Sequence, residues 1–376
     1  MRRLVAQISP FIATMQPTRL SSIGLPRNTL VVTSDGIAST VCVGRCVSAA
    51  MTTSNRARGR NHGRAGDRRY HSRMRNVSTP IGAAWSGAMC ESTRLLLGTF
   101  VSIGVGGLER AQAEAAIVKG FAAIERVHSL MSFHSADSDV ARINGAVPAQ
   151  PVPIAPETFA VLELARKVSQ ASSGVFDVTM APLLVDNGNL PAPLRAPDPE
   201  ARWSDVVLEA PDAVSLRRPL WIDLGGIAKG YAVDLAASAM ALPETASWYV
   251  NAGGDLRVGG PTMHPVALEV PDFHAAEFET SARETPARPF IELENGSLAS
   301  SAAGANRRHF FGHEPASVVA PAFVSVVARQ CAIADALTKV VLARGRQAAA
   351  VLAAFDASAY LYSPSEGWWM SGGELE

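Results

Sequence analysis

The chain has 376 residues, with 34 basic and 34 acidic side chains and a hydrophobic content of 48%. This composition indicates a globular protein of one large domain or two ordinary ones. No apolar stretch reaches transmembrane length, and the four cysteines form neither a disulfide framework nor a zinc-binding pattern.

The N-terminal part, residues 1–93, is expected to be a basic extension without regular structure. Residues 1–94 hold 14 arginines and three acidic residues. Residues 56–75 are rich in Arg, Gly, Asn and His and lack an apolar period, which is typical of disorder. Aromatic side chains are almost absent there, so nucleic-acid bases would have no rings to stack on. We therefore expect no nucleic-acid partner.

The first residues resemble the start of a signal peptide, with Met1 followed by two arginines. Ser9-Pro10 and Gln16-Pro17 interrupt the apolar part, whereas a signal peptide needs an uninterrupted apolar run. The sequence therefore predicts no signal peptide, and the expected compartment is the cytoplasm.

The rest of the chain alternates between strand and helix patterns. A strand is expected over 94–105, and helical spacing of apolar residues follows over 108–127. Ser138 is a candidate helix cap. Further helices are expected at 156–169, 231–240, 332–343 and 347–355, and strands at 206–208, 215–216, 220–224, 248–251, 256–258, 324–328 and 359–363. Runs of strands and runs of helices indicate an α+β fold, in which Cys331 is a small core residue.

The segment 222–234 places an acid, exposed backbone N–H groups and a cation at one strand-to-helix corner. Asp223 ends an apolar run, a Gly-Gly turn follows, and Lys229 begins an Ala-rich helix. A helix N-terminus of this kind can hold phosphate. It is not a P-loop, because Gly230 follows the lysine, and no G-x-G-x-x-G opens a helix. The alternative is an ordinary tight turn in which Asp223 caps the helix at Ile227.

This corner is one of an ordered series of motifs. The others are Leu97-Gly98-Thr99-Phe100, Met131–His134 with Asp137-Ser138 and Arg142–Asn144, Gly174–Asp177, Asn251–Asp255 and Ala334–Thr338. In this order and at these distances, they resemble the ApbE family, the FAD:protein FMN transferases. The resemblance runs from about Arg94 to the C-terminus. It implies one α+β domain over 94–376, with ApbE-like (T-fold-like) mixed sheets and packed helices.

The resemblance also implies an activity. Such an enzyme is magnesium-dependent, splits FAD and attaches FMN to a threonine of an acceptor flavoprotein, releasing AMP. We therefore expect FAD as substrate and Mg²⁺ as cofactor. Two alternatives are an FAD pyrophosphatase, in which water replaces the threonine, and a flavin-binding or carrier protein without transferase chemistry. Family members are often periplasmic or anchored to the membrane as lipoproteins, in contrast to the missing signal peptide here.

The resemblance assigns flavin contacts to residues of four motifs. Leu97 takes the place of the family's usual Met, and His134 takes the place of a Tyr or Trp that stacks on the cofactor. The other expected contacts are Val175, Phe176, Asp177, Asp223 and Lys229. For Asp177, the alternative is a turn residue beside a core Phe.

Magnesium prefers hard oxygen ligands, which the resemblance places at Gly226, Asp335 and Thr338. Asp335 and Thr338 share a helix face at i and i+3, and at Gly226 only a backbone carbonyl remains. The family's strongest metal Thr lies one position later, where this chain has Lys339. This replacement of Thr by Lys either abolishes metal binding or moves the metal site to Thr338. Asp335 is also the candidate catalytic base, with a nearby His as the alternative.

One family signature is largely missing. Relatives carry a His-hydrophobic-hydrophobic-Asp-Pro segment, of which His309-Phe310-Phe311 is the remnant, since no Asp precedes Pro315. Ser300-Ser301 lie where relatives carry a Ser/Thr-Ser-Gly segment. These departures indicate a divergent branch of the family.

Overall fold

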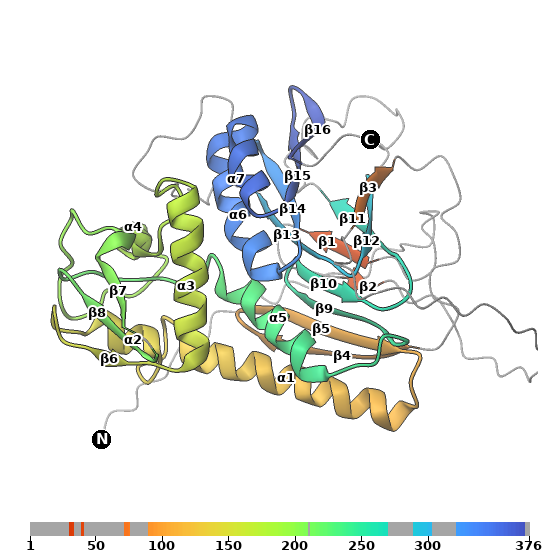
Figure 1. The fold of residues 1–376 in the computed structure, drawn as a ribbon, viewed down its shortest axis with the longest axis horizontal. Helices are drawn as coiled ribbons and strands as arrows, with labels where there is room; N and C mark the ends of the chain where they lie inside the picture. Colours follow the sequence, from red (N-terminus) through yellow and green to blue (C-terminus); the bar gives the residue numbers. More distant parts are fainter. Residues whose placement is uncertain are drawn as a thin grey trace, which may run out of the picture.

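A computed structural model describes residues 89–209, 211–269, 289–302 and 321–372, together with the backbone of 30–33, 39–40 and 71–75. An eight-stranded sheet forms the centre of the molecule, with strand order β16-β15-β14-β13-β10-β9-β5-β4 and antiparallel pairing throughout. Helices α1, α5 and α6 cover one face of this sheet (Figure 1). The expected α+β class is confirmed.

The strands of the central sheet come from both ends of the described chain. They are β4 (Met89–Leu96), β5 (Thr99–Gly106), β9 (Ser247–Ala252), β10 (Asp255–Gly259), β13 (Ser297–Ala302), β14 (Phe323–Ala328), β15 (Ser358–Ser363) and β16 (Gly367–Ser371). The helices on its face are α1 (Arg110–Met131), α5 (Ala228–Met240) and α6 (Cys331–Arg344), and α7 (Ala349–Ala354) follows the short 3₁₀ helix η4 (Gly345–Ala348).

The single strand expected over 94–105 is wrong, because the chain folds there into the β4–β5 hairpin. Leu97 and Gly98 form its two-residue turn with φ of 55° and 73°. Two positive φ values in a two-residue loop match the twist of the flanking strands, but a leucine there gives no turn signal in the sequence. The hairpin also takes residues 89–93 into the sheet, five residues before the expected start of the domain.

A smaller lobe lies beside the helical layer. It contains α2 (Asp139–Asn144), α3 (Pro156–Ala171), η2 (Val178–Met180), α4 (Ala181–Asp186) and η3 (Trp203–Asp205), and a sheet of β6 (Val152–Pro153), β8 (Ala213–Leu216) and β7 (Val206–Glu209). Helix α3 connects the lobe to the body through contacts with α1 and α6 (Figure 1). The expected cap is confirmed, since Ser138 Oγ accepts from the N–H of Ala141 at 3.0 Å.

A second sheet has the order β2-β1-β11-β12-β3. Its strands are β1 (Leu30–Thr33), β2 (Ser39–Thr40), β3 (His71–Arg75), β11 (His264–Glu269) and β12 (Phe290–Glu294). The expectation that 1–93 lacks regular structure is therefore wrong for these three early strands and for 89–93. Strand β1, with the sequence LVVT, has the β-branched composition of a strand, whereas β3, with the sequence HSRMR, gives no such signal. The remnant segment at 309–315 lies outside the described residues.

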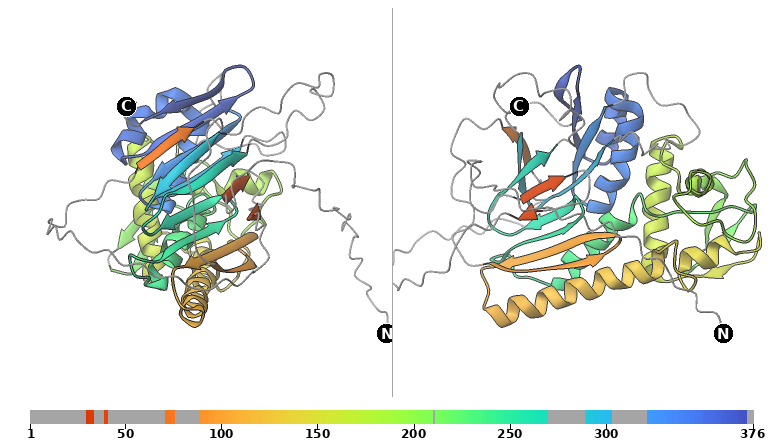
Figure 2. Two further views of the ribbon diagram at one scale, coloured as in Figure 1. Left: turned by 90° about the vertical axis from the view of Figure 1, so that its right-hand side faces the viewer. Right: turned by 180° about the vertical axis from the view of Figure 1, so that it is seen from behind.

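The two faces of the central sheet bury two cores. The larger core lies under α1, α5 and α6 and includes Cys331, which is fully buried as expected. The smaller core joins β9, β10 and β13 to β11 and β12, and Tyr249 and Ile291 are among its members. Figure 2 shows the helices gathered on one side of the sheet and β11 and β12 on the other.

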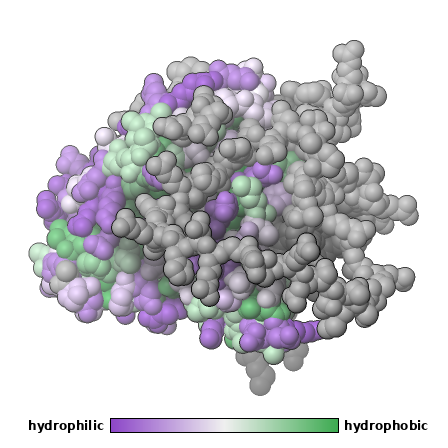
Figure 3. Space-filling view, turned by 45° about the vertical axis from the view of Figure 1, so that its right-hand side comes forward, coloured by the Kyte–Doolittle hydropathy of each residue, from purple (hydrophilic) through white to green (hydrophobic). Residues whose placement is uncertain are grey.

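None of the helices in the described part of the chain combines the length and apolarity needed to cross a bilayer. On the face shown in Figure 3, hydrophobic patches of the described residues are small and interrupted by hydrophilic ones.

Helices α5 and α6 meet in an unusually close contact. Gly230 lies against the start of α6, and a Cβ at this position would collide with the Cys331 carbonyl and lie 2.8 Å from Ala332 Cα. Four residues later, the Asp234 carboxylate accepts the N–H groups of Cys331 and Ala332 at 3.0 and 2.9 Å. Side chains of α6 itself cap none of its N–H groups, so Asp234 satisfies donors that would otherwise be unpaired.

Gly230→Ala should therefore lower the free energy of unfolding by about 1–3 kcal/mol, because the added methyl forces the two helices apart. Chemical denaturation measures this change. Gly145→Ala is the matched control, since a Cβ there meets Ala141 O at 3.5 Å, an ordinary contact, and should change stability by less than about 0.5 kcal/mol. Equal effects of the two substitutions would contradict the close-contact explanation.

Candidate functional site

The strand-to-helix corner is held in place from outside its own segment. Residues 220–224, expected as a strand, belong to no sheet. Instead, Asn144 from α2 pairs with the backbone of Ile222, accepting its N–H at 2.7 Å and donating to its carbonyl at 3.1 Å. The N–H of Asp223 donates to Val178 O at 2.8 Å. A side chain and a 3₁₀ helix thus supply the hydrogen bonds that a neighbouring strand would have made.

Asp223 faces the glycine turn and does not cap the helix. Helix α5 begins after Ile227 and has no side-chain cap at that residue. Asp223 instead accepts the N–H of Gly225, and its role as a ligand contact or a turn residue stays a prediction. Burial raises the pKa of the Asp223 carboxyl, while the N–H of Gly225 and the nearby His134 and Lys339 act in the opposite direction. A carboxyl with a raised pKa beside exposed N–H groups can accept or donate a hydrogen bond to a ligand.

The corner adjoins the Phe176 motif and Lys339. A Cβ at Gly226 would lie 3.4 Å from the Phe176 ring and 3.6 Å from Lys339 Cε. Phe176 and its neighbour Val175 are buried, and the Phe176 N–H donates to Ser172 Oγ at 3.1 Å. An aromatic ring, a glycine turn and the end of a lysine side chain therefore meet at the start of α5.

Asp177 has partners within its own lobe. Its Oδ1 accepts the N–H and the hydroxyl of Thr179, both at 2.7 Å, and its Oδ2 accepts the N–H of Trp203 at 3.3 Å. These contacts cap η2, and they match the turn role considered as the alternative to a flavin contact.

The other expected flavin contacts lie at the edge of this group. His134 is exposed and close enough to act on the charge of Asp223. Leu97 is half-buried at the tip of the β4–β5 hairpin and packs on the larger core. The same tip contacts the glycine turn before β10, where the N–H of Gly253 donates to Phe100 O at 3.2 Å.

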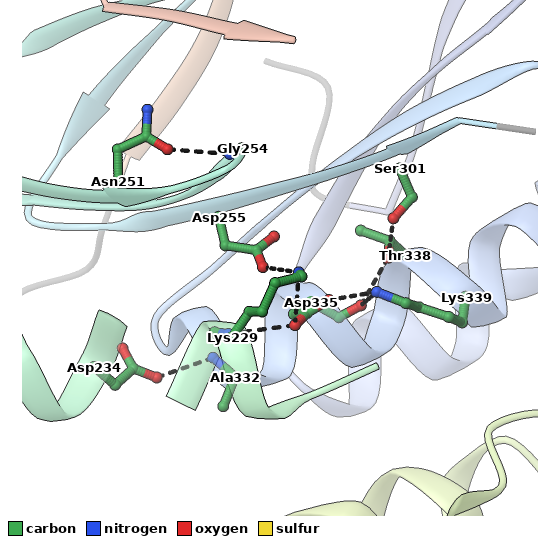
Figure 4. Close-up of polar contacts among 11 residues, drawn as sticks. Lys229, Asp234, Asn251, Gly254, Asp255, Ser301, Ala332, Asp335, Thr338 and Lys339 are labelled. Carbon is green, nitrogen blue, oxygen red and sulfur yellow. Dashed lines mark hydrogen bonds and ion pairs between the residues drawn. The ribbon is translucent and has the colours of Figure 1, made fainter. Parts of the chain in front are cut away.

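Four charged side chains form a cluster between α5, α6 and β10 (Figure 4). Lys229 Nζ contacts Asp255 Oδ2 and lies 3.5 Å from Asp335 Oδ2, which also accepts the N–H of Gly230 at 3.2 Å. Lys339 Nζ contacts Asp335 Oδ1 and donates to Asp335 O at 3.0 Å. Both carboxylates are 1% exposed, whereas the lysine side chains are 31% and 24% exposed. The lysine side chains of the cluster are therefore partly exposed, whereas its carboxylates are buried.

The electrostatics of the cluster follow from this arrangement. Burial and the charge of Asp335 raise the pKa of Asp255, against the effect of Lys229 and Lys339. Burial also acts to raise the pKa of Asp335, but Lys229 and Lys339 outweigh it and leave that pKa lowered. Burial acts to lower the pKa of Lys229, but Asp255 and Asp335 outweigh it and leave that pKa raised. Both cations are thus held by two buried anions, and the cluster is close to neutral.

The expected magnesium ligands do not fit the ion in this arrangement. Both oxygens of the Asp335 carboxylate accept from cations or N–H groups. Thr338 is fully buried, donates to Asp335 O at 2.7 Å and shares a hydrogen bond with Ser301 Oγ at 2.9 Å. Within the described residues, no group of three or more His, Cys, Asp or Glu side chains is placed to hold a metal. Lys339 lies between Gly226 and Asp335, where the ion was expected.

Sequence reasoning missed two contributors to the site. Asp255 belongs to a motif of the series, but its ion pair with Lys229 joins residues 26 positions apart. Asn144 likewise belongs to a motif, and its pairing with Ile222 spans 78 positions. The order of the motifs was the available signal for both residues, but it does not say which side chains meet.

Comparisons with known proteins show what the chain is similar to. A family model described as "ApbE family" matches residues 97–361. The FAD:protein FMN transferase of Klebsiella pneumoniae (strain 342) is 23% identical over 260 residues, covering 65% of this chain and 72% of the relative. The FAD:protein FMN transferase of Haemophilus influenzae is 27% identical over 195 residues, covering 48% of this chain and 55% of the relative.

Solved structures show the same fold. The crystal structure of the ApbE protein from Thermotoga maritima matches with a TM-score of 0.60 at 24% identity, covering 76% of this chain and 97% of that one. The apo form of Pseudomonas stutzeri flavinyl transferase ApbE matches with a TM-score of 0.61 at 20% identity, covering 77% and 96%.

The cluster predicts a pH-dependent defect for Lys229→Met. Removing this ammonium leaves two buried carboxylates with one cation, which should cost about 3 kcal/mol of unfolding free energy at pH 8. In the variant, a carboxyl with a folded-state pKa raised above its unfolded value binds a proton on folding. Stability is therefore regained as the pH falls, and the deficit relative to wild type should shrink at pH 5.5.

Urea denaturation at both pH values measures this effect. Lys167→Met on the exposed side of α3 is the matched control and should show little change at either pH. A Lys229→Met deficit that is equal at pH 8 and pH 5.5 would mean that the two carboxylates do not depend on this lysine.

Proposed function

The chain belongs to the ApbE family, and we propose that it is an FAD:protein FMN transferase that attaches FMN to a threonine of an acceptor protein and releases AMP. Its relatives of that name support the activity. The observation that carries the proposal is the meeting of Asp223, Phe176 and the Gly-Gly turn with the end of the Lys339 side chain, which Asp335 joins to Lys229. We assign the activity to the body expected at 94–376, together with the first residues of β4.

This arrangement fits the two halves of FAD. Phe176, Val175 and Leu97 offer apolar surface for the flavin, with His134 at the exposed edge for stacking. The 13-residue helix α5 offers the positive end of its dipole to the pyrophosphate. Asp223 lies between these two regions, where a flavin or ribose hydrogen bond is available to it.

The proposed reaction breaks the phosphoanhydride bond of FAD and forms a phosphoester bond to threonine. The threonine oxygen forms a bond to the phosphorus of the FMN half, and the bond from that phosphorus to the bridging oxygen breaks. AMP leaves with the bridging oxygen and the bonding electron pair, and the hydroxyl proton passes to a base or to solvent. Catalysis of such a transfer consists mainly of positioning and charge stabilisation, which Lys229 and Lys339 are placed to provide.

Asp335, the candidate catalytic residue, has a lowered pKa and is therefore a weak proton acceptor. Its proposed contribution is to hold the two ammonium groups at the pyrophosphate through its two oxygens. Asp177 keeps its place among the proposed flavin contacts through its backbone, next to Phe176. The magnesium ion implied by the resemblance has no free set of ligands at Gly226, Asp335 and Thr338, so no step is assigned to it.

The function is tested by incubating the full chain with FAD and a candidate acceptor flavoprotein. Transferase activity should give covalent flavin fluorescence on the denatured acceptor and an equal amount of AMP, both lost when the target threonine is changed to valine. AMP with free FMN in the absence of acceptor would identify a pyrophosphatase. Bound but uncleaved FAD would identify a carrier.

Asp223→Ala should weaken FAD binding by about 1–3 kcal/mol, because one hydrogen bond involving a carboxyl is lost. Quenching of flavin fluorescence in an equilibrium titration measures the affinity. Asp212→Ala, at an exposed position before β8, is the control and should bind FAD as the wild type does. Wild-type affinity in Asp223→Ala would reduce the corner to a structural turn.

A further inference from the structure

We infer that the ammonium of Lys339 is the built-in cation of this site and occupies the position at which a divalent ion would bind, so that the chain cleaves FAD without a metal at Asp335. The identity of the anionic ligand rests on the proposed function. The position of the ammonium rests on the contacts of Lys339 alone.

Lys339 bends back along α6 onto Asp335, one turn before it. Its Nζ contacts Asp335 Oδ1 and the main-chain carbonyl of the same residue at 3.0 Å. Its Cε lies 3.6 Å from the point where a Cβ on Gly226 would be. The charged end of Lys339 therefore fills the space between the carboxylate and the glycine turn, with its side chain 24% exposed and within reach of a ligand.

The oxygens near Lys339 already have partners, so a metal would compete with them. Asp335 Oδ2 already accepts from Lys229 and Gly230. The Thr338 hydroxyl donates to Asp335 O and is fully buried. A metal at Asp335 would have to displace an ammonium that is covalently attached four residues away.

The charge balance of the cluster also disfavours a metal ion at Asp335. The buried carboxylates of Asp255 and Asp335 match the two ammonium groups. Adding a divalent ion would leave two uncompensated positive charges, which is costly in a buried setting. An ammonium carries three N–H donors, and the contacts of Lys229 and of Lys339 within the described residues use two each. Each lysine thus retains one donor for a phosphate oxygen.

An ammonium and a divalent ion support the reaction differently. The ammonium neutralises one charge and donates a hydrogen bond to a pyrophosphate oxygen, and its presence does not depend on the metal concentration. A divalent ion would instead need oxygen ligands that Lys339 removes. The site should therefore reject metal in the wild type and accept it when residue 339 carries an oxygen.

Binding of Mn²⁺, followed by electron paramagnetic resonance, tests the inference without any flavin. Wild type should bind no Mn²⁺ at this site, and Lys339→Thr should bind one ion per chain. Lys339→Ser provides a second variant with a side-chain oxygen if the threonine variant does not fold and should also bind one ion, and Lys167→Thr on α3 is the control with wild-type behaviour. One Mn²⁺ bound by the wild type, or none bound by a folded Lys339→Thr, would overturn the inference.

FAD cleavage gives the second readout, as AMP release with EDTA or with added Mg²⁺. Wild type should be equally active in both, and Lys339→Met should lose at least about tenfold in rate, equivalent to about 1.4 kcal/mol. Magnesium should restore activity to Lys339→Thr but not to Lys339→Met.

Loss of wild-type activity in EDTA, or full activity of Lys339→Met, would overturn the inference. If no protein cleaves FAD under any condition, the proposed function fails, and the Mn²⁺ measurement alone decides the place of Lys339.

Discussion

The close contact between α5 and α6 is the constraint on which the rest of the site depends. Gly230 allows the approach, and Asp234 accepts the two N–H groups at the start of α6. Because Lys229 precedes this contact on α5 and Asp335 follows it on α6, the same approach brings a lysine and a buried carboxylate together. Moving the helices apart would separate these charges before it disturbed the central sheet. The crossing of α5 and α6 therefore determines both how these helices pack and which charged side chains of the cluster meet.

The cluster of Lys229, Asp255, Asp335 and Lys339 and the corner at Asp223 serve different parts of one ligand. The corner presents N–H groups and a carboxyl, whereas the cluster presents two ammonium groups backed by buried anions. The anions hold the lysine side chains in place, so little conformational freedom remains to be lost when a pyrophosphate binds. Such an arrangement is suited to stabilising charge that develops on a leaving phosphate.

Patterns local in the sequence predicted the local structure well. The long helix after β5, the cap at Ser138 and the burial of Cys331 all follow from neighbouring residues. Apart from the β4–β5 hairpin, whose turn at Leu97 gives no local signal, the failures involve a partner far away in the chain. Residues 220–224 look like a strand but bond to Asn144 and Val178. Strands β1 and β3 pair with β11 and β12, more than 200 positions away.

For the site, too, local motifs could be recognised in the sequence, whereas contacts between distant residues could not. The motif order located Asp223, Lys229 and Asp335, because each lies at a turn or helix start that the sequence marks clearly. It could not show that Asp255 pairs with Lys229, or that Lys339 bends onto Asp335 and leaves Thr338 buried.

The pairing of Asn144 with Ile222 has a further consequence, for the chemical stability of the Asn144 side chain. Asn144 precedes Gly145, a sequence in which the glycine nitrogen readily attacks the side-chain amide, but here that nitrogen donates to Ala141 O at 3.0 Å. The folded state therefore protects the amide, and a molecule that opens locally and deamidates would place a carboxylate against the Ile222 carbonyl and could not close the corner again.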